Sequence, residues 1–245
     1  MKCSKCGKEM RKGYLFSSKD GAFSFANEVP GVFENAKNAE GFVEITKLKP
    51  SHRTRVEANC CEECRMIVSN IVVLSGSVRK GGNTELLVQA FVDGAKKNNS
   101  VEVISVADYK VNPCIGCNTC FDREGHECFQ KDDMTKVYEK LKMADVLVIA
   151  SPVYFYGVSA QLKALIDRLH TPMRNEFKLK KLALILVGAA ALPELFDAIK
   201  VQYRLVLNYF KLEDVGTVFV RGAKDKGDVK NTDGLEKAYQ LGTAI

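Results

Sequence analysis

Asn70-Ile71-Val72-Val73-Leu74-Ser75, followed at once by Gly76-Ser77-Val78-Arg79-Lys80-Gly81-Gly82-Asn83-Thr84, is the stretch of this chain that decides its fold. A short apolar run ends in a loop of glycines and hydroxyls, and helical periodicity begins behind it. The pattern predicts a buried strand, a tight loop and a helix. Glycines let backbone N–H groups converge, and a helix N-terminus favours an anion. With the charge of Arg79 added, the loop is predicted to hold a phosphate monoester.

Two nucleotide-binding motifs do not match this loop. A Walker A loop needs Lys and Ser or Thr directly after its second glycine, but Gly81 is followed by Gly82 and Asn83. The dinucleotide fingerprint needs a glycine two residues after the first, and Gly76 has none there. A solvent-exposed turn capped by Asn83 or Thr84 remains the simpler alternative.

Downstream of this stretch, apolar strands alternate with segments of helical period, which favours a parallel sheet covered on both faces. Two helices stand out because their apolar residues recur at i, i+3, i+4 and i+7, from Met134 to Leu141 and from Leu162 to Leu169. A helix is also expected from Pro193 to Phe210, and a last one over Asp233 to Leu241. The predicted fold class is α/β, a flavodoxin-like doubly wound sheet of five parallel strands. These strands are Asn70–Ser75, Val101–Val106, Val146–Ser151, Leu182–Gly188 and Val215–Val220.

An aromatic segment, Ser151-Pro152-Val153-Tyr154-Phe155-Tyr156-Gly157-Val158-Ser159, follows the third of these strands. In a doubly wound sheet a second ligand-binding loop belongs at this place. Its aromatic side chains offer flat apolar contact to a ring system, although core or dimer packing would use them equally well.

The phosphate loop and the aromatic segment together resemble the NAD(P)H-dependent FMN reductase family, and more specifically its iron–sulfur flavoprotein branch. The match covers about three-quarters of the chain. By this resemblance Gly188 to Ala191 flank the flavin, and NAD(P)H is the co-substrate. The one departure is Val78, where the family usually has proline. The resemblance implies that FMN is bound through its phosphate by Ser77, Arg79, Asn83 and Thr84, and through its ring by Pro152, Val153, Tyr154, Phe155, Tyr156 and Gly157.

Four of the nine cysteines lie between the second predicted strand and the next helix, at Cys114, Cys117, Cys120 and Cys128. Thiolates spaced by two residues can converge on a cuboidal cluster. The spacing resembles the compact motif of iron–sulfur flavoproteins, and a 4Fe-4S cluster is expected here, close to FMN. Zinc or reactive thiols are the alternatives.

The first part of the chain, residues 1–67, is predicted to be a small β-rich module, and residues 68–245 the FMN-binding domain. Cys3 and Cys6 form one pair, and Cys61 and Cys64 form another more than fifty residues later. Two such pairs suit one tetrahedral ion. Zinc is expected, with iron in a rubredoxin-like site as the alternative, and Cys60 is left over.

Composition limits the other classes of function. The net charge of +6 is dispersed along the chain, which makes nucleic acid an improbable partner. The longest apolar run is too short to span a membrane, and the charged N-terminus has no signal-peptide pattern. A cytoplasmic protein is expected.

The expected function is an enzyme, an FMN-dependent oxidoreductase that passes electrons from NAD(P)H through FMN to an unidentified acceptor. No side chain is expected to act as a catalytic acid or base, since the chemistry belongs to the cofactor. The resemblance implies a homodimer or tetramer. An electron carrier without its own substrate, or a regulator acting through the zinc module, remain alternatives.

Overall fold

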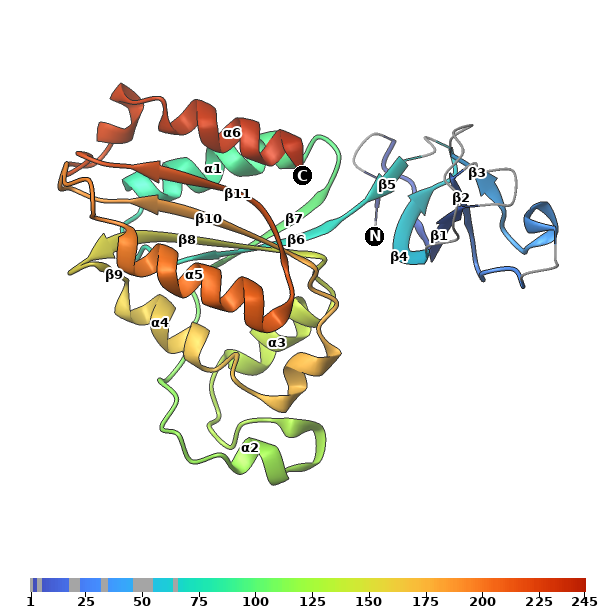
Figure 1. Ribbon diagram of the computed structural model, residues 1–245, viewed down its shortest axis with the longest axis horizontal. Helices are drawn as coiled ribbons and strands as arrows, with labels where there is room; N and C mark the ends of the chain where they lie inside the picture. The colour runs from blue at the N-terminus through green and yellow to red at the C-terminus, as the bar shows by residue number, and fades with distance from the viewer. Residues whose placement is uncertain (1, 4–5, 18–22, 32–34, 46–54, 64–65) are drawn as a thin grey trace. The chain divides into compact units, whose positions relative to one another are not determined.

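The chain divides into two compact units, each described here by itself (Figure 1). The structure is a computed structural model that describes residues 2–3, 6–17, 23–31, 35–45, 55–63 and 66–245. One unit comprises residues 1–69 and 97–100, and the other comprises residues 70–96 and 101–245. That residues 1–67 and 68–245 fold as separate domains stays a proposal.

The smaller unit is built on an antiparallel sheet in the order β3-β2-β1-β4-β5. Aromatic residues form part of its core, since Phe16 and Phe25 are fully buried. The prediction of a small β-rich module is therefore confirmed. Its strands are β1 (Arg11–Ser17), β2 (Phe23–Ala26), β3 (Val43–Glu44), β4 (Arg55–Cys61) and β5 (Met66–Val68), and a short 3-10 turn, η1, spans Ala36–Asn38.

The larger unit has a central sheet in the order β11-β10-β8-β6-β7, and the two-residue β9 pairs antiparallel with the end of β8. Strands β6, β8, β10 and β11 run parallel. Counted along this unit, the order is 2-1-3-4-5, which is the flavodoxin-like order. The fold prediction is confirmed. The strands are β6 (Asn70–Ser75), β7 (Ser100–Ser105), β8 (Val146–Tyr154), β9 (Gly157–Val158), β10 (Lys181–Val187) and β11 (Glu213–Val220).

Helices cover both faces of this sheet (Figure 1). Alternate residues of β6 point to opposite faces. Thus Val72 and Leu74 join the core under α3, α4 and α5, while Ile71 and Val73 join the core under α1 and α6. The helices are α1 (Asn83–Ala95), α2 (Thr119–Asp122), α3 (Met134–Lys142), α4 (Ala160–Asp167), α5 (Asp197–Phe210) and α6 (Gly234–Ala244), with 3-10 turns at Glu124–His126, Pro172–Glu176 and Asp228–Asn231.

One predicted boundary is wrong, because α5 begins at Asp197 and not at Pro193. The guanidinium of Arg221 explains the difference. Its Nε donates to Leu192 O at 2.9 Å and its Nη2 donates to Pro193 O at 2.6 Å. The Asp197 N–H, which a helix from Pro193 would direct to Pro193 O, donates instead to Glu194 O at 3.0 Å. The side chain of Arg221 thus holds this segment as a turn.

Candidate flavin site

The predicted phosphate loop lies between β6 and α1, and the free N-terminus of α1 points at it. Gly82 is the N-cap of α1 and supplies no side-chain cap. Ser77 and Thr84 are buried, whereas Arg79 is exposed. Ser77 Oγ accepts a hydrogen bond from Arg79 N at 3.2 Å. Backbone donors, two hydroxyls and one cation therefore surround a single turn, as a phosphate monoester requires.

Asn83 lies in this loop but directs its side chain elsewhere. Its Nδ2 donates to Ala223 O at 3.2 Å and to Asp225 O at 2.8 Å, and its Oδ1 accepts from Gly227 N at 2.9 Å. The side-chain amide thereby fixes the loop after β11 against the phosphate loop. Any contact of Asn83 with a phosphate would come from its backbone N–H.

The phosphate loop touches the segment that leads into α4. Ser159 Oγ donates to Gly76 O at 2.7 Å, and the same oxygen accepts from Leu162 N at 3.3 Å as the N-cap of α4. A Cβ on Gly76 would lie 2.9 Å from both Ser159 Oγ and Leu162 Cδ2, so only glycine allows this approach.

The aromatic segment forms a tight hairpin between β8 and β9. Tyr154 pairs with Gly157, and the two turn residues Phe155 and Tyr156 have φ of +47° and +60°. Such turns normally hold Asn and Gly, because bulky side chains are strained at positive φ. Phe155 is nevertheless 100% exposed, and Tyr154 and Tyr156 are about half exposed. Strain of this kind is typical of binding sites.

These elements enclose a cavity of about 270 Å³ at the carboxyl ends of β6, β8 and β10. This is where the strand order reverses, and it is the usual ligand crevice of such sheets. Five of the predicted residues are not part of its lining: Ser77, Thr84, Phe155, Tyr156 and Gly157. The cavity is lined by Arg79, Asn83, Pro152, Val153, Tyr154, Val187, Gly188, Ala189, Ala223 and Lys224.

Sequence reasoning missed Ala223 and Lys224 in this lining. They follow β11, and nothing in their composition marks a ligand contact. Their place is set by the hydrogen bonds of Asn83 and by the backbone bond from Ala223 N to Gly188 O at 3.1 Å. Gly188 itself was expected, and a Cβ there would lie 2.6 Å from Leu195 Cδ2.

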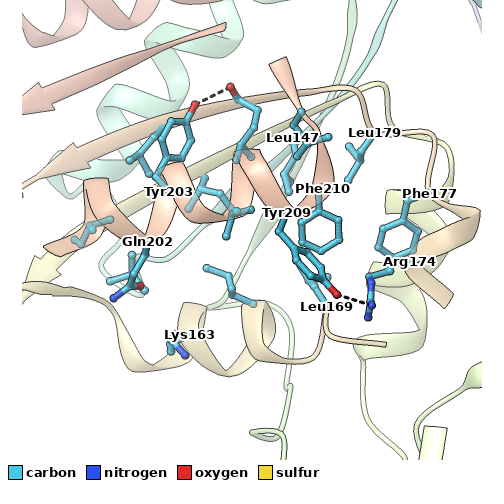
Figure 2. Close-up of a pocket in the computed structure, with 18 of the residues that line it drawn as sticks. Leu147, Lys163, Leu169, Arg174, Phe177, Leu179, Gln202, Tyr203, Tyr209 and Phe210 are labelled. Atoms are coloured by element: carbon cyan, nitrogen blue, oxygen red, sulfur yellow. Dashed lines mark hydrogen bonds between the residues drawn. The ribbon is translucent and has the colours of Figure 1, made fainter. Parts of the chain in front are cut away.

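A larger cavity of about 410 Å³ lies elsewhere, between α4, α5 and the sheet (Figure 2). Its walls are mostly leucine, isoleucine and aromatic side chains, and no predicted site residue lines it. Its main cation is engaged, because Arg174 Nη2 donates to Tyr209 Oη at 2.9 Å and Nη1 to Thr171 O at 3.1 Å. The chemistry predicted from sequence therefore belongs to the smaller cavity.

The cysteine segment of the larger unit does not line either cavity. Figure 1 shows the segment with α2 projecting beyond α3 and α4, whereas the β8–β9 hairpin lies at the end of the sheet. Cys114 and Cys117 are exposed, Cys120 and Cys128 are half-buried, and none of the four forms a disulfide. The segment thus lines no part of the flavin crevice within one chain, and its closeness to FMN stays a prediction.

Cys117 has the most distinctive environment of the four. A hydrogen bond between Cys117 Sγ and Thr119 Oγ1 at 3.3 Å lowers the pKa of the thiol, and the backbone N–H of Thr119 adds to the effect. Within the part of the chain that the structure describes, no three His, Cys, Asp or Glu side chains are gathered closely enough to hold a metal ion.

The N-terminal zinc prediction falls partly outside the described residues. Cys3 is buried and Cys6 exposed, but Cys64 and the side chain of Cys61 lie outside them. Cys60, the residue left over in the prediction, is fully buried.

Residues 69–224 match the family model for NADPH-dependent FMN reductase. The chain belongs to this family. This FMN reductase family member is therefore an FMN-dependent NAD(P)H oxidoreductase, and the predicted enzyme class is confirmed. A second family model, a domain of unknown function, matches residues 3–72.

Two relatives are similar over most of the FMN reductase region. An iron-sulfur flavoprotein of Methanocaldococcus jannaschii is 38% identical over 71% of this chain and 94% of its own length. An iron-sulfur flavoprotein of Archaeoglobus fulgidus is 32% identical over 71% of this chain and 77% of its own. Homologues of the iron–sulfur flavoprotein branch thus confirm the resemblance.

Solved structures support the fold. The NAD(P)H:quinone oxidoreductase of Methanothermobacter marburgensis superposes with a TM-score of 0.57 at 14% identity, over 72% of this chain and 96% of its own. An FMN-dependent NADH-azoreductase of Bacillus anthracis, in complex with FMN, gives 0.53 at 13% identity, over 71% and 98%. Among the described residues of the FMN reductase family member, no helix is long and apolar enough to cross a bilayer.

Proposed function

We propose that this enzyme takes hydride from NAD(P)H onto FMN held in the cavity beside the phosphate loop, and passes the electrons to an acceptor. The observation that carries the proposal is the joining of two sequence-distant loops by the 2.7 Å bond from Ser159 to Gly76. It sets a phosphate cradle and an aromatic wall around one crevice, as a phosphorylated flavin requires. FMN, when bound, supplies both the hydride acceptor and stepwise electron release.

The residues present fit this cofactor. The loop from Ser77 to Thr84 would hold the phosphate, with Arg79 as its cation and the N-terminus of α1 as its dipole. Pro152 to Gly157 would border the ring, and Gly188 and Ala189 leave room for it. Tyr154 presents an apolar face that is half exposed, which suits stacking of a planar group.

The test is steady-state oxidation of NADH and NADPH by the FMN-loaded protein, with quinone and ferricyanide as acceptors. We expect turnover only when FMN is bound. Reduction of FMN without turnover on any acceptor would favour the electron carrier instead. Removal of residues 1–67 would alter partner binding only if the regulator alternative were correct.

We also propose a 4Fe-4S cluster on Cys114, Cys117, Cys120 and Cys128. Four thiols in one short segment have the right donor chemistry, and relatives at 38% and 32% identity carry the iron-sulfur flavoprotein name. The sulfurs are not gathered in the structure, so cluster assembly would have to draw this exposed segment together. Anaerobic reconstitution should give about four irons per chain, and Cys117→Ala should lose them while keeping FMN.

A homo-oligomer is part of the same proposal. Within one chain the cysteine segment lines no part of the flavin cavity. A contact between chains would give electrons a path between the cluster of one chain and the flavin of another. Analytical ultracentrifugation should give a dimer or tetramer, and a monomer would exclude such transfer.

For the N-terminal unit we propose structural zinc on Cys3, Cys6, Cys61 and Cys64. A unit of this size buries little apolar surface, and a metal is a common substitute for a larger core. The double variant Cys3→Ser, Cys6→Ser should release one zinc per chain and leave flavin absorbance unchanged. Iron at this site would support the rubredoxin-like alternative.

A further inference from the structure

The segment that carries the four cysteines between β7 and α3 has little apolar packing of its own. Cys114 and Cys117 are exposed, and the aromatic residues Phe121 and Phe129 are 43% and 44% exposed. Its middle is held by a hydrogen bond from Thr171 Oγ1 to His126 O at 3.0 Å, and polar contacts at its two ends do most to close it.

Those two ends are joined by hydrogen bonds. Lys110 N donates to Asp133 Oδ2 at 2.9 Å, and Asp133 N donates to Lys110 O at 3.1 Å. One step inward, Gln130 Nε2 donates to Pro113 O at 3.1 Å. Every one of the four cysteines lies inside the loop that these bonds close.

A buried ion pair lies at the centre of this closure. Arg168 Nη1 donates to Asp132 Oδ2 at 2.7 Å, and Arg168 Nη2 donates to Asp132 Oδ1 at 3.3 Å. The side chains are only 2% and 5% exposed. Arg168 is the residue at the C-terminal cap of α4, so the pair fastens the loop to the body of the sheet domain.

The other hydrogen bonds of Asp132 and Arg168 hold the chain on both sides of the cysteines. Asp132 also accepts from Asn112 N at 2.9 Å and from Met134 N at 3.1 Å, and Arg168 Nη1 donates to Asn112 O at 3.0 Å. Residues before and after the cysteines thus share one carboxylate and one guanidinium. Tyr138 Oη also donates a hydrogen bond to the backbone carbonyl of Arg168 at 2.6 Å, which fixes the position of this residue.

We propose that Asp132 and Arg168 are positioning residues that clasp the two ends of the cysteine loop, and so limit the arrangements from which its four thiols gather around a cluster. The clasp itself rests on the contacts above, and its role toward a cluster rests on the proposed function. A loop without the clasp keeps all four ligands but samples many arrangements, and so it binds iron less completely.

Arg168 also acts on the loop through its charge. Burial lowers the pKa of its guanidinium, but the hydrogen bond and the charge of Asp132 raise it above its ordinary value, so Arg168 stays a cation within the clasp. Arg168 Nε is buried with no hydrogen-bond partner among the described residues.

The test compares Arg168→Gln, Arg168→Lys and Asp132→Asn with Lys163→Gln. Lys163 lies on the same helix, in an exposed i,i+4 pair with Asp167, and is the matched control. Amide hydrogen exchange of residues 110–134 is measured on the metal-free full chain, and iron content on the reconstituted protein. FMN binding reports whether each variant is folded, and the milder Asp132→Asn serves if Arg168→Gln fails to fold.

We expect exchange in residues 110–134 to rise at least tenfold in Arg168→Gln and Asp132→Asn, with iron content at most half that of the control. Arg168→Lys should keep more iron and show slower exchange than Arg168→Gln, because lysine retains the charge although not the bidentate geometry. Exchange and iron content equal to those of Lys163→Gln would overturn the proposal. If the unaltered chain binds no iron, the cluster proposal fails, while the exchange comparison still decides whether the clasp exists.

Discussion

Ser159 Oγ donates a 2.7 Å hydrogen bond to Gly76 O and thereby joins two loops that lie more than eighty residues apart in the chain. The same hydroxyl caps α4, so one buried side chain secures the phosphate loop, the aromatic hairpin and a helix N-terminus. The contact therefore holds the two sides of the crevice together.

Replacement of Ser159 by alanine should therefore lower both stability and flavin affinity. Loss of a helix cap together with a buried hydrogen bond costs about 1–3 kcal/mol of the free energy of unfolding. Urea unfolding of the apo-protein and FMN titration measure the two effects. Ser105→Ala, at the end of β7 and outside the cavity lining, is the control, and equal behaviour of the two variants would contradict the assigned role.

Arg79→Ala should weaken FMN binding at least tenfold, because a charge-assisted hydrogen bond to a phosphate contributes roughly 1.5–3 kcal/mol. Riboflavin, which lacks the phosphate, should bind the variant and the unaltered protein alike. The neighbouring Lys80→Ala, also exposed, tests whether any nearby cation suffices. An FMN dissociation constant unchanged in Arg79→Ala would remove this residue from the site.

The double variant Phe155→Asn, Tyr156→Gly should raise the stability of the apo-protein. Both residues have positive φ, and relief of such strain is worth about 1–3 kcal/mol for each position. FMN affinity should fall at the same time if these rings serve the ligand. Thermal unfolding without FMN gives the first quantity and fluorescence titration the second. Apo-protein stability that stays the same or drops would show that the turn is not strained.

Acid should weaken the clasp between Asp132 and Arg168. Burial alone would raise the pKa of Asp132, but hydrogen bonds from Arg168 and from the backbone N–H groups of Asn112 and Met134 lower it below its ordinary value. A depressed folded-state pKa means that the contribution is complete above the unfolded pKa of about 3.9. It is lost as pH falls through the lower folded-state value.

Asp132→Asn should therefore be less stable than the unaltered chain by about 3 kcal/mol near neutral pH, since it leaves a buried guanidinium uncompensated. The difference in the free energy of unfolding should stay constant down to about pH 5 and shrink below about pH 4. Urea unfolding at a series of pH values measures it. A difference that is independent of pH down to pH 2 would refute the assignment of this carboxylate.

Most strands and helices of the sheet domain could be predicted from the pattern of apolar residues in short stretches of sequence. The short apolar run Asn70–Ser75 indicates a strand that is buried on both faces, and the i, i+3, i+4, i+7 repeat in α3 indicates a helix buried on one face. Each of these patterns can be read from a short stretch of consecutive residues. Arg221 shows where this fails. The turn before α5 is held by a side chain that follows β11, and no local window contains both partners.

The sequence by itself determined the fold class, the phosphate loop, the aromatic segment and the family, because each rests on residue types at short spacing. Only the tertiary structure decided which side chains face the crevice. It turned the amide of Asn83 toward residues 223–229, brought Lys224 into the lining and left the cysteine loop out of that lining. It also paired Asp132 with Arg168. Such contacts join residues far apart in the chain, and their energy depends on burial and direction, which exist only once the chain has folded.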